Sequence, residues 1–405
     1  MTITASAMTT IARHTVNDVL GTLPRSGIRR LTDQVMGSRD MDDAIQLGFG
    51  QPQEATDDLI REAIIKATDE RTLGYTENAG MRVLRDAIAT KLAVRNQIET
   101  DVESIFVTPG ATYGVAVTIG CLINPGDEVL VPDPGYPNFA AAVHHYGGVV
   151  KFYQLRQDTG FVPDLNELAA LISPATKALI INSPGNPTGA VIDAGMMEQL
   201  VRLTRERGLW LVSDEVYETY VYGCRHVSPL SLSGSDHVVG LYSFSKSYNI
   251  TGLRVGYVVT RHPALRRALL NAQELYISCA PSISQYAALQ ALADGGAYPE
   301  AMRAAYQQKR DLVMNMLGPY AGRRPEGAFY LLVDIGFTGL HSDEFADRLL
   351  RDTHVVVAPG ATFGPSSDQF IRIAFTPQVE KLRAGLTRLK QFLSQWPIAD
   401  EEDHQ

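Results

Sequence analysis

The sequence is poor in cysteine, in tryptophan and in long apolar runs. Its three cysteines, Cys121, Cys224 and Cys279, lie far apart and none belongs to a Cys-x-x-Cys pair. That distribution argues for a reducing compartment and against both a disulfide framework and a zinc site. No apolar run approaches the roughly 18 to 20 residues of a membrane span, and the first residues lack the apolar core of a signal peptide. We therefore expect a cytoplasmic protein with no membrane segment and no metal centre.

Neither positive nor negative charge is concentrated in one part of the chain. The 36 lysines and arginines and the 45 aspartates and glutamates give a net charge of −9 without long runs of either sign. Nucleic acids and anionic membranes attract clustered basic residues, so neither is an expected partner. The 405 residues, 45% of them hydrophobic, exceed one ordinary core and favour two domains.

What the chain does contain is an alternation of short apolar runs with helical patterns. Such alternation predicts an α/β protein with a mostly parallel sheet covered by helices on both faces. The expected strands are residues 105–107, 128–131, 149–153, 178–181, 209–212, 238–242 and 255–259. Together they would form a seven-stranded sheet, with functional residues at the carboxyl ends of its strands.

The pattern changes near residue 290, which predicts a boundary between domains. We expect an N-terminal arm and the first part of a small domain in residues 1–52, a large domain in 53–290, and the rest of a smaller α+β domain in 291–405. The last helix is expected to begin with Thr376 as its cap and Pro377 as its first residue.

Lys246 stands just after the apolar run 238–242, where a core meets a cleft. Burial, or a cation such as Arg254 eight residues further on, lowers the pKa of a lysine toward neutrality. The resulting amine can form a Schiff base with an aldehyde. The alternative is a solvated surface lysine, and this motif by itself does not decide between them.

Small-residue turns follow two other expected strands. Residues 108–114, Thr-Pro-Gly-Ala-Thr-Tyr-Gly, open a helix whose free N–H groups could hold a phosphate, although a generic strand-to-helix turn has the same composition. Residues 132–138, Pro-Asp-Pro-Gly-Tyr-Pro-Asn, would project Tyr136 toward a planar ligand, or form an ordinary loop.

Two further strand ends carry polar side chains. Asn186 lies in a turn between two prolines and can offer an amide donor. Asp214 follows an apolar run, where a carboxylate is costly unless a cation or a strong donor meets it. A protonated ring nitrogen and a structural arginine are both suitable partners for Asp214.

Taken together, these motifs resemble those of the class I/II aminotransferase family, in its aspartate and aromatic aminotransferase branch. The resemblance runs from Ser26-Gly-Ile-Arg-Arg30 to Phe370-Ile-Arg-Ile-Ala-Phe375, and it includes Asn186-Pro-Thr-Gly, Asp214-Glu-Val-Tyr217, Ser243-Phe-Ser-Lys246 and Arg254-Val-Gly. It implies the fold-type I structure of pyridoxal 5′-phosphate (PLP) enzymes, and it implies a homodimer.

The resemblance implies a role for each matching residue. Lys246 would form the internal aldimine with PLP and later move the proton between the substrate Cα and the cofactor. Asp214 would hold the pyridine N–H, and Asn186 and Tyr217 would donate to the phenolic oxygen of the ring. Tyr136 would stack on the ring.

The remaining roles concern the phosphate and the substrate. The resemblance implies phosphate contacts from the turn at Gly110, Ala111 and Thr112 and from Ser243, Ser245 and Arg254. Tyr75 would reach the phosphate bound to the neighbouring subunit. Arg372 would bind the substrate α-carboxylate, with help from the Gly50 main chain and Asn186.

Thr112 bears on the choice of substrate, and Tyr113 on the surroundings of the expected cofactor. Family members that hold a second carboxylate with a lysine have it where this chain has Thr112, so we expect neutral amino acids as donors rather than aspartate. Tyr113 lies near the expected cofactor, facing either the ring or the core.

The expected reaction is a ping-pong exchange of an amino group between an L-amino acid and a 2-oxo acid. A β-lyase, a decarboxylase or a cyclising synthase could use the same groups. A PLP-binding transcriptional regulator would need a DNA-binding domain, and the roughly 25 residues before the family-like arm show no helix-turn-helix pattern.

Overall fold

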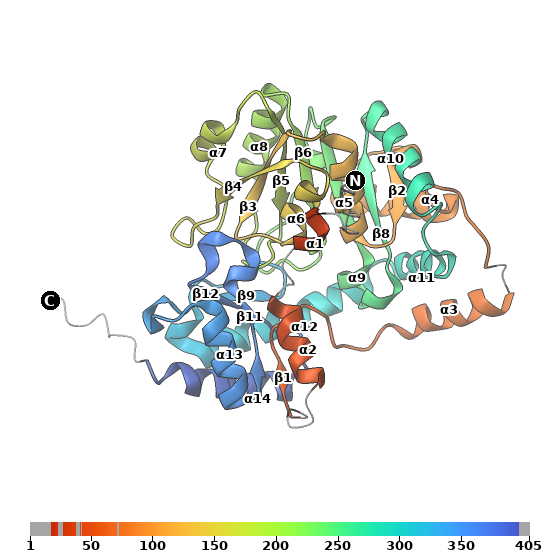
Figure 1. Cartoon of the computed structure of the whole chain (residues 1–405). Helices are drawn as coiled ribbons and strands as arrows, with labels where there is room; N and C mark the ends of the chain where they lie inside the picture. The colour runs from red at the N-terminus through yellow and green to blue at the C-terminus, as the bar shows by residue number, and fades with distance from the viewer. Residues whose placement is uncertain (1–17, 23–26, 38–40, 42, 71–72, 397–405) are drawn as a thin grey trace, which may run out of the picture.

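The computed structural model describes all residues except 1–17, 23–26, 38–40, 42, 71–72 and 397–405. Its largest element is a seven-stranded sheet in the order β2-β8-β7-β6-β5-β3-β4 (Figure 1). The strands are β2 (Ile105–Thr108), β3 (Glu128–Asp133), β4 (Val149–Gln154), β5 (Thr176–Asn182), β6 (Trp210–Asp214), β7 (Val238–Ser243) and β8 (Gly256–Thr260). β8 is antiparallel to both neighbours, β2 and β7, and all other pairs are parallel. The predicted mostly parallel sheet of seven strands is confirmed.

Successive side chains of a strand point to opposite faces of the sheet. Because the strands are continuously apolar, both faces are buried. In β5, Ala178 and Ile180 join the cluster on one face and Leu179 and Ile181 join the cluster on the other. The first face packs against α5 (Ala111–Leu122), α6 (Asn138–His145) and α10 (Pro263–Tyr276). The second packs against α4 (Arg82–Lys91), α7 (Leu165–Leu171), α8 (Ala194–Glu206) and α11 (Ser282–Ala293).

Helix α3 (Asp58–Glu70) lies at the edge of the molecule and packs along α11 (Figure 1). The spacing of its apolar residues predicts one buried face that includes Leu59 and Ile60, but Leu59 is 52% exposed whereas Ile60 is 2% exposed. Two short elements precede this region, α1 (Asp18–Thr22) and α2 (Gly27–Gly37). No helix in the described part of the chain is long and apolar enough to cross a membrane.

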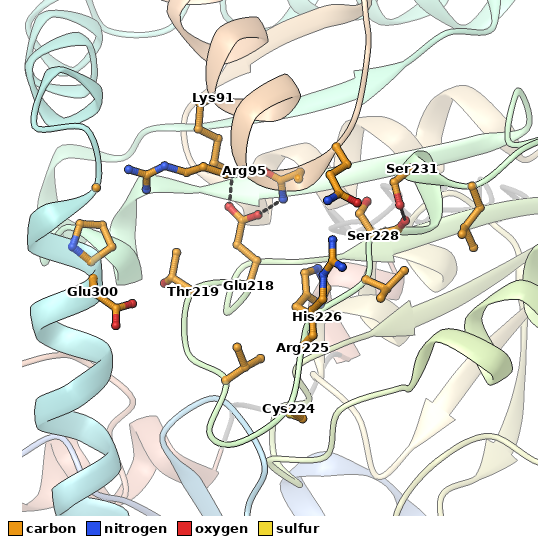
Figure 2. A pocket seen from close by; sticks show the side chains of 17 residues that line it. Lys91, Arg95, Glu218, Thr219, Cys224, Arg225, His226, Ser228, Ser231 and Glu300 are labelled. Atoms are coloured by element: carbon orange, nitrogen blue, oxygen red, sulfur yellow. Dashed lines mark hydrogen bonds and ion pairs between the residues drawn. The ribbon is translucent and has the colours of Figure 1, made fainter.

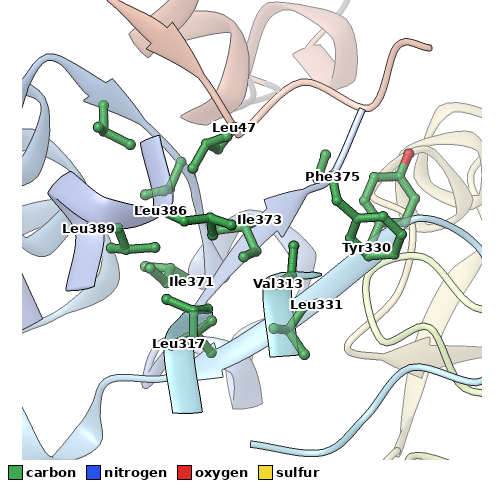
Figure 3. Packing of buried hydrophobic residues seen from close by; sticks show 14 of the residues in the cluster. Leu47, Val313, Leu317, Tyr330, Leu331, Ile371, Ile373, Phe375, Leu386 and Leu389 are labelled. Carbon is green, nitrogen blue, oxygen red and sulfur yellow. The ribbon is translucent and has the colours of Figure 1, made fainter. Parts of the chain in front are cut away.

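A second layer of structure is built on a three-stranded antiparallel sheet, β11-β12-β9. Its strands are β9 (Tyr330–Asp334), β11 (Ala358–Pro359) and β12 (Phe370–Ala374), and β1 (Ile45–Gln46) pairs separately with β10 (Val355–Val356). The helices here are α12 (Ala297–Leu317), α13 (Ser342–Thr353) and α14 (Val379–Leu393). Figure 3 shows their shared core, where Leu386 and Leu389 of α14 pack beside Ile371 and Ile373 of β12.

This core also includes Tyr217, Tyr220 and Tyr222 from the segment that follows β6 of the large sheet. The two sheets therefore share apolar contacts next to the carboxyl end of β6. The proposed division at residues 52 and 290 stays a prediction.

The start of α14 differs from the prediction. The helix begins at Val379, and its preceding residue, Gln378, provides no side-chain cap. Thr376 does not cap the helix, because its hydroxyl donates to the Phe49 carbonyl at 3.1 Å. Thr376 thus joins the C-terminal part of the chain to the segment that follows β1.

Candidate active site

The carboxyl ends of three adjacent parallel strands define the site. In the register of the sheet, Asn182 at the end of β5 is opposite Asp214 at the end of β6, and Asp214 is opposite Leu241 near the end of β7. Ser243 ends β7 and is followed at once by α9 (Phe244–Ser247), which carries Lys246. The register therefore brings the residues of three separate motifs to one edge of the sheet.

Lys246 points its amine toward the backbone of the segment after β1. Its Nζ donates a hydrogen bond to the Gly50 carbonyl at 2.6 Å, and it lies 6.0 Å from the centre of the Phe329 ring. Burial, with the positive charges of Arg372 and Arg254, lowers the pKa of Lys246 to about 8. A substantial fraction of the amine is then neutral and nucleophilic near neutral pH.

Asp214 is a buried carboxylate, 5% exposed. It accepts a hydrogen bond from the Val216 backbone N–H at 3.1 Å, and among the described residues it has no ion-pair partner. Burial is the main cause that raises the pKa of Asp214 to about 7. A cationic donor bound beside it would lower that pKa again.

Arg372, on β12, is a buried cation held by two oxygen atoms. Its Nη1 donates to Asn186 Oδ1 at 2.8 Å and its Nη2 donates to the Gly48 carbonyl at 2.6 Å. The guanidinium lies over the rings of Tyr330 and Phe363, with its central carbon 4.3 and 4.7 Å from their centres. Its buried Nε has no partner in the described structure.

Tyr217 forms a hydroxyl pair with Tyr330. Their oxygens are 2.8 Å apart, and burial raises the pKa of Tyr217 well above its ordinary value, so the hydroxyl stays protonated. The sequence interpretation did not include Tyr330, the first residue of β9. The only signal was an aromatic pair after Gly327 and Ala328, and such a pair is equally typical of a core strand.

The turn before α5 lies against the positive charge of Arg254. Gly110 precedes this helix with a φ of +82°, and a Cβ on it would lie 2.5 Å from Arg254 Nη2, so the arginine lies directly against the turn. Ala111 and Thr112 are the first two residues of the helix. Ser243 and Ser245 come from the neighbouring strand end, where the Ser243 hydroxyl accepts from the Ser245 N–H at 3.1 Å. Helix N–H groups, hydroxyls and a guanidinium are the groups that bind phosphate.

Tyr136 reaches the same turn from the loop after β3. Its hydroxyl is 3.3 Å from the Thr112 hydroxyl and accepts from Asn138 Nδ2 at 2.8 Å. The ring packs edge-on against Phe139, with ring centres 5.4 Å apart.

Asn182 was also missed by sequence reasoning. Its Oδ1 accepts from the Asn186 N–H at 2.7 Å, and its Nδ2 donates to the Asp214 carbonyl at 2.9 Å. Asn182 therefore ties the Asn186 turn to the end of β6. Its position as the last residue of an apolar strand was the available signal.

Two candidates lie apart from this group. Tyr113, on α5, is partly buried and packs against the apolar cluster on the first face of the large sheet, and burial raises its pKa to about 12. Tyr75 is 89% exposed, and in this chain its side chain is open to solvent.

Comparison with known proteins identifies the class. The family model for aminotransferase class I and II matches residues 42–389, so the chain belongs to that family. It is a PLP-dependent aminotransferase, as the sequence motifs predicted.

Individual relatives span nearly the whole chain. An arginine–pyruvate transaminase of Pseudomonas aeruginosa is 38% identical over 352 residues, which cover 86% of this chain and 89% of that protein. An aspartate aminotransferase of Pyrococcus abyssi is 34% identical over 385 residues, covering 93% and 98%. The solved structure of an aromatic aminotransferase from Pyrococcus horikoshii superposes with a TM-score of 0.84 at 34% identity, covering 90% and 99%.

The residues present fit the PLP that members of this family use. Asp214 is a buried carboxylate without a cation, suited to a pyridinium N–H. Lys246 is an amine with a lowered pKa, suited to an aldehyde. Arg254 lies against the N-terminal turn of α5, suited to a phosphate. These three groups match the ring nitrogen, the aldehyde and the phosphate of the cofactor.

We predict that Asp214→Asn changes the pH dependence of stability in the cofactor-free protein. Because burial raises the pKa of Asp214 from 3.8 to about 7, the wild type loses stability as the pH rises through that window. An asparagine does not titrate, so the variant should gain free energy of unfolding relative to wild type between pH 3.8 and about 7, with a constant difference above.

Urea unfolding across that pH range measures the effect. The exposed Asp158 provides a control, since Asp158→Asn should follow the wild-type profile. Parallel profiles for Asp214→Asn and wild type would show that Asp214 titrates as an ordinary surface carboxylate.

Proposed function

We propose that Lys246, Asp214, Asn186, Tyr217 and Arg372 form the catalytic site of a ping-pong aminotransferase. The observation that carries the proposal is the position of the Lys246 amine, which lies against the Gly50 carbonyl and has its pKa lowered by burial and, to a lesser degree, by Arg372 and Arg254. When bound, PLP supplies an aldehyde that reacts with amines and a protonated ring that accepts electrons from the substrate.

Each residue has one task in this proposal. Asp214 accepts the ring N–H and keeps the ring protonated, a charge-assisted hydrogen bond worth about 1.5 to 3 kcal/mol. Tyr217 and Asn186 donate to the phenolic oxygen. With PLP bound, the Lys246 amine would take up the proton from the substrate Cα and carry it to the atom that is reprotonated. Tyr136 covers the ring.

Arg372 binds the substrate α-carboxylate. Its buried Nε has no partner among the residues that the structure describes, and its Nη1 is bonded to Asn186, so a carboxylate can be held by both side chains. The Gly48 and Gly50 carbonyls accept from Arg372 and Lys246 and hold the two cations at neighbouring points of one segment. The substrate Cα is thereby directed toward the amine.

We expect borohydride reduction of the purified protein to attach PLP covalently to Lys246. Lys246→Ala should abolish both that attachment and turnover, because no other amine stands at the strand end of β7. Peptide mapping identifies the labelled residue. Lys381→Ala, a change at an exposed lysine of α14, should leave both unchanged. Label on another lysine in the wild type would contradict the assignment.

The preferred donor is proposed to be a neutral amino acid, aromatic or long-chain. Thr112 presents a small neutral hydroxyl beside Tyr136 rather than a cation that could bind a second carboxylate. The relatives include aspartate, aromatic and arginine–pyruvate aminotransferases, so their names do not decide the substrate.

A donor panel tests this substrate class. Phenylalanine or leucine should exceed aspartate in kcat/KM by at least about tenfold, which corresponds to about 1.4 kcal/mol of transition-state binding. Thr112→Lys should shift the ratio toward aspartate, whereas Thr112→Ser, which retains a hydroxyl, should not. Aspartate as the best donor of the wild type would overturn the substrate class.

The same mixtures distinguish transamination from the other PLP reactions. Without a 2-oxo acid acceptor, each site should release one equivalent of 2-oxo acid and then stop. Continued release of ammonia or carbon dioxide would instead indicate a lyase or a decarboxylase.

We also propose a homodimer in which Tyr75 reaches the phosphate site of the partner. Tyr75 is 89% exposed, and its segment is anchored to the stretch after α10 by the Asn78 side chain, which donates to the Ser278 carbonyl at 2.9 Å. The end of α10 exposes Leu275 and Tyr276, 75% and 53% respectively, which makes an apolar patch suited to a second copy.

Sedimentation equilibrium should give twice the chain mass, and Tyr75→Phe should weaken PLP binding about tenfold, because one phosphate contact is lost. Tyr320→Phe removes a hydroxyl from the C-terminal region and should leave PLP affinity unchanged. A monomeric wild type would remove this role for Tyr75.

A further inference from the structure

A cavity lies outside the group of residues proposed to bind PLP. It has a volume of about 510 Å³ and opens between the end of α4, the loop over residues 218–232 and the start of α12 (Figure 2). That volume is typical of a small-molecule site. None of its lining residues is assigned to the PLP site. Glu218 nevertheless directly follows Tyr217, and the Thr219 hydroxyl is 3.1 Å from the hydroxyl of Ser247, the residue after Lys246.

The acidic side chains of the cavity are already neutralised. Glu218 accepts from Lys91 Nζ and from Asn96 Nδ2, the contacts drawn as dashed lines in Figure 2. Glu300 pairs with Arg303 at 2.6 Å. Because both carboxylates are paired with cations, they do not make the cavity attractive to a cationic ligand.

Two arginines of the lining are not neutralised. Arg95 and Arg225 have no hydrogen-bond or ion-pair partner for their guanidinium groups within the described residues, and both line the cavity in Figure 2. Arg95 extends across Gly296, where a Cβ would lie 1.5 Å from its Nη2. Guanidinium groups bind carboxylates through two parallel N–H bonds, so the cavity is suited to an organic anion.

Two buried acceptors in the same lining have no donor. Asn96 donates through Nδ2 to the Glu218 carboxylate. The buried Oδ1 of Asn96 has no hydrogen-bond partner among the described residues. His226, whose side chain is 7% exposed, bonds through Nε2 to Glu215 at 2.7 Å, and its buried Nδ1 likewise has no partner. In the tautomer whose Nε2 donates to the carboxylate, Nδ1 carries no hydrogen and is an acceptor. Buried acceptors without donors are costly, which indicates a ligand that supplies them.

We propose that this cavity binds a small carboxylic acid that also carries a hydroxyl or amino donor, that is, a 2-hydroxy or 2-amino acid. Arg225, which lies beside His226, binds its carboxylate, Arg95 on the other side of Glu218 adds positive charge, and the acceptors of Asn96 and His226 receive its donor (Figure 2). The apolar part of the ligand lies against the aliphatic side chains of the lining, Val221, Val227, Leu232 and Pro299.

L-3-Phenyllactate is a suitable probe, because it has a carboxylate, a hydroxyl and an apolar ring but no amine that can react with PLP. Calorimetric titration uses holoenzyme carrying Arg372→Ala, which weakens the carboxylate site of the active centre. We expect one saturable site per chain. Arg95→Ala with Arg225→Ala should weaken binding at least about tenfold, whereas Arg202→Ala, at an exposed arginine of α8, should not.

The acceptor half of the proposal has its own test. 3-Phenylpropionate lacks the hydroxyl and should bind several-fold more weakly than L-3-phenyllactate. Asn96→Leu should remove that difference by weakening only the hydroxy acid. Arg225→Ala alone changes an exposed loop residue, so it gives a folded variant if the double substitution does not.

Three results would overturn the proposal. They are the absence of saturable binding, equal affinity in the Arg95 and Arg225 variants and in Arg202→Ala, and displacement of the probe by active-site substrates with no effect of the arginine changes.

Discussion

The structure depends on the burial of three ionisable groups, two at strand ends of the large sheet and one on β12 of the small sheet. Lys246, Asp214 and Arg372 are removed from water, and burial shifts the pKa of each group toward its neutral form. Among the described residues none of the three is neutralised by a partner of opposite charge, since Lys246 and Arg372 are held by neutral carbonyl and amide oxygens. Such an arrangement stores unfavourable electrostatic free energy, which ligands of complementary charge can release.

The site also requires both parts of the chain. Arg372 comes from the small sheet, yet its side chain is bonded to Asn186 of the turn after β5. Tyr330 of β9 is bonded in turn to Tyr217 of the segment after β6. Contacts of this kind make the position of the Arg372 guanidinium depend on how the small sheet packs against the large one.

Much of this arrangement could be predicted from the sequence because burial imposes a pattern. All seven strands of the large sheet were located, since a parallel sheet buried on both faces needs continuous apolar runs. The polar residues at strand ends, such as Asp214 and Lys246, were found because they interrupt such runs. Their roles on the cofactor came from family resemblance and remain proposals.

Other features depend on contacts between distant segments, which local patterns do not encode. Tyr330 looks like a core aromatic until its hydroxyl is seen against Tyr217. Thr376 followed by proline has the pattern of a helix cap, but a carbonyl more than 300 residues away binds its hydroxyl. Leu59 fits an apolar face by spacing, although it is 52% exposed.

The short segment from Gly48 to Gly50 has a consequence for how the enzyme can change. One of its carbonyls receives the arginine and another receives the lysine, so two peptide units, roughly 7 Å of extended chain, set the spacing of the two cations. A side chain at Gly50 would overlap the Tyr330 hydroxyl, with only 2.0 Å between the atoms. A residue with a side chain therefore cannot replace Gly50 unless Tyr330 moves. Thr112 belongs to the start of α5 and not to this segment, so a substitution at Thr112 leaves the spacing of the two charges unchanged.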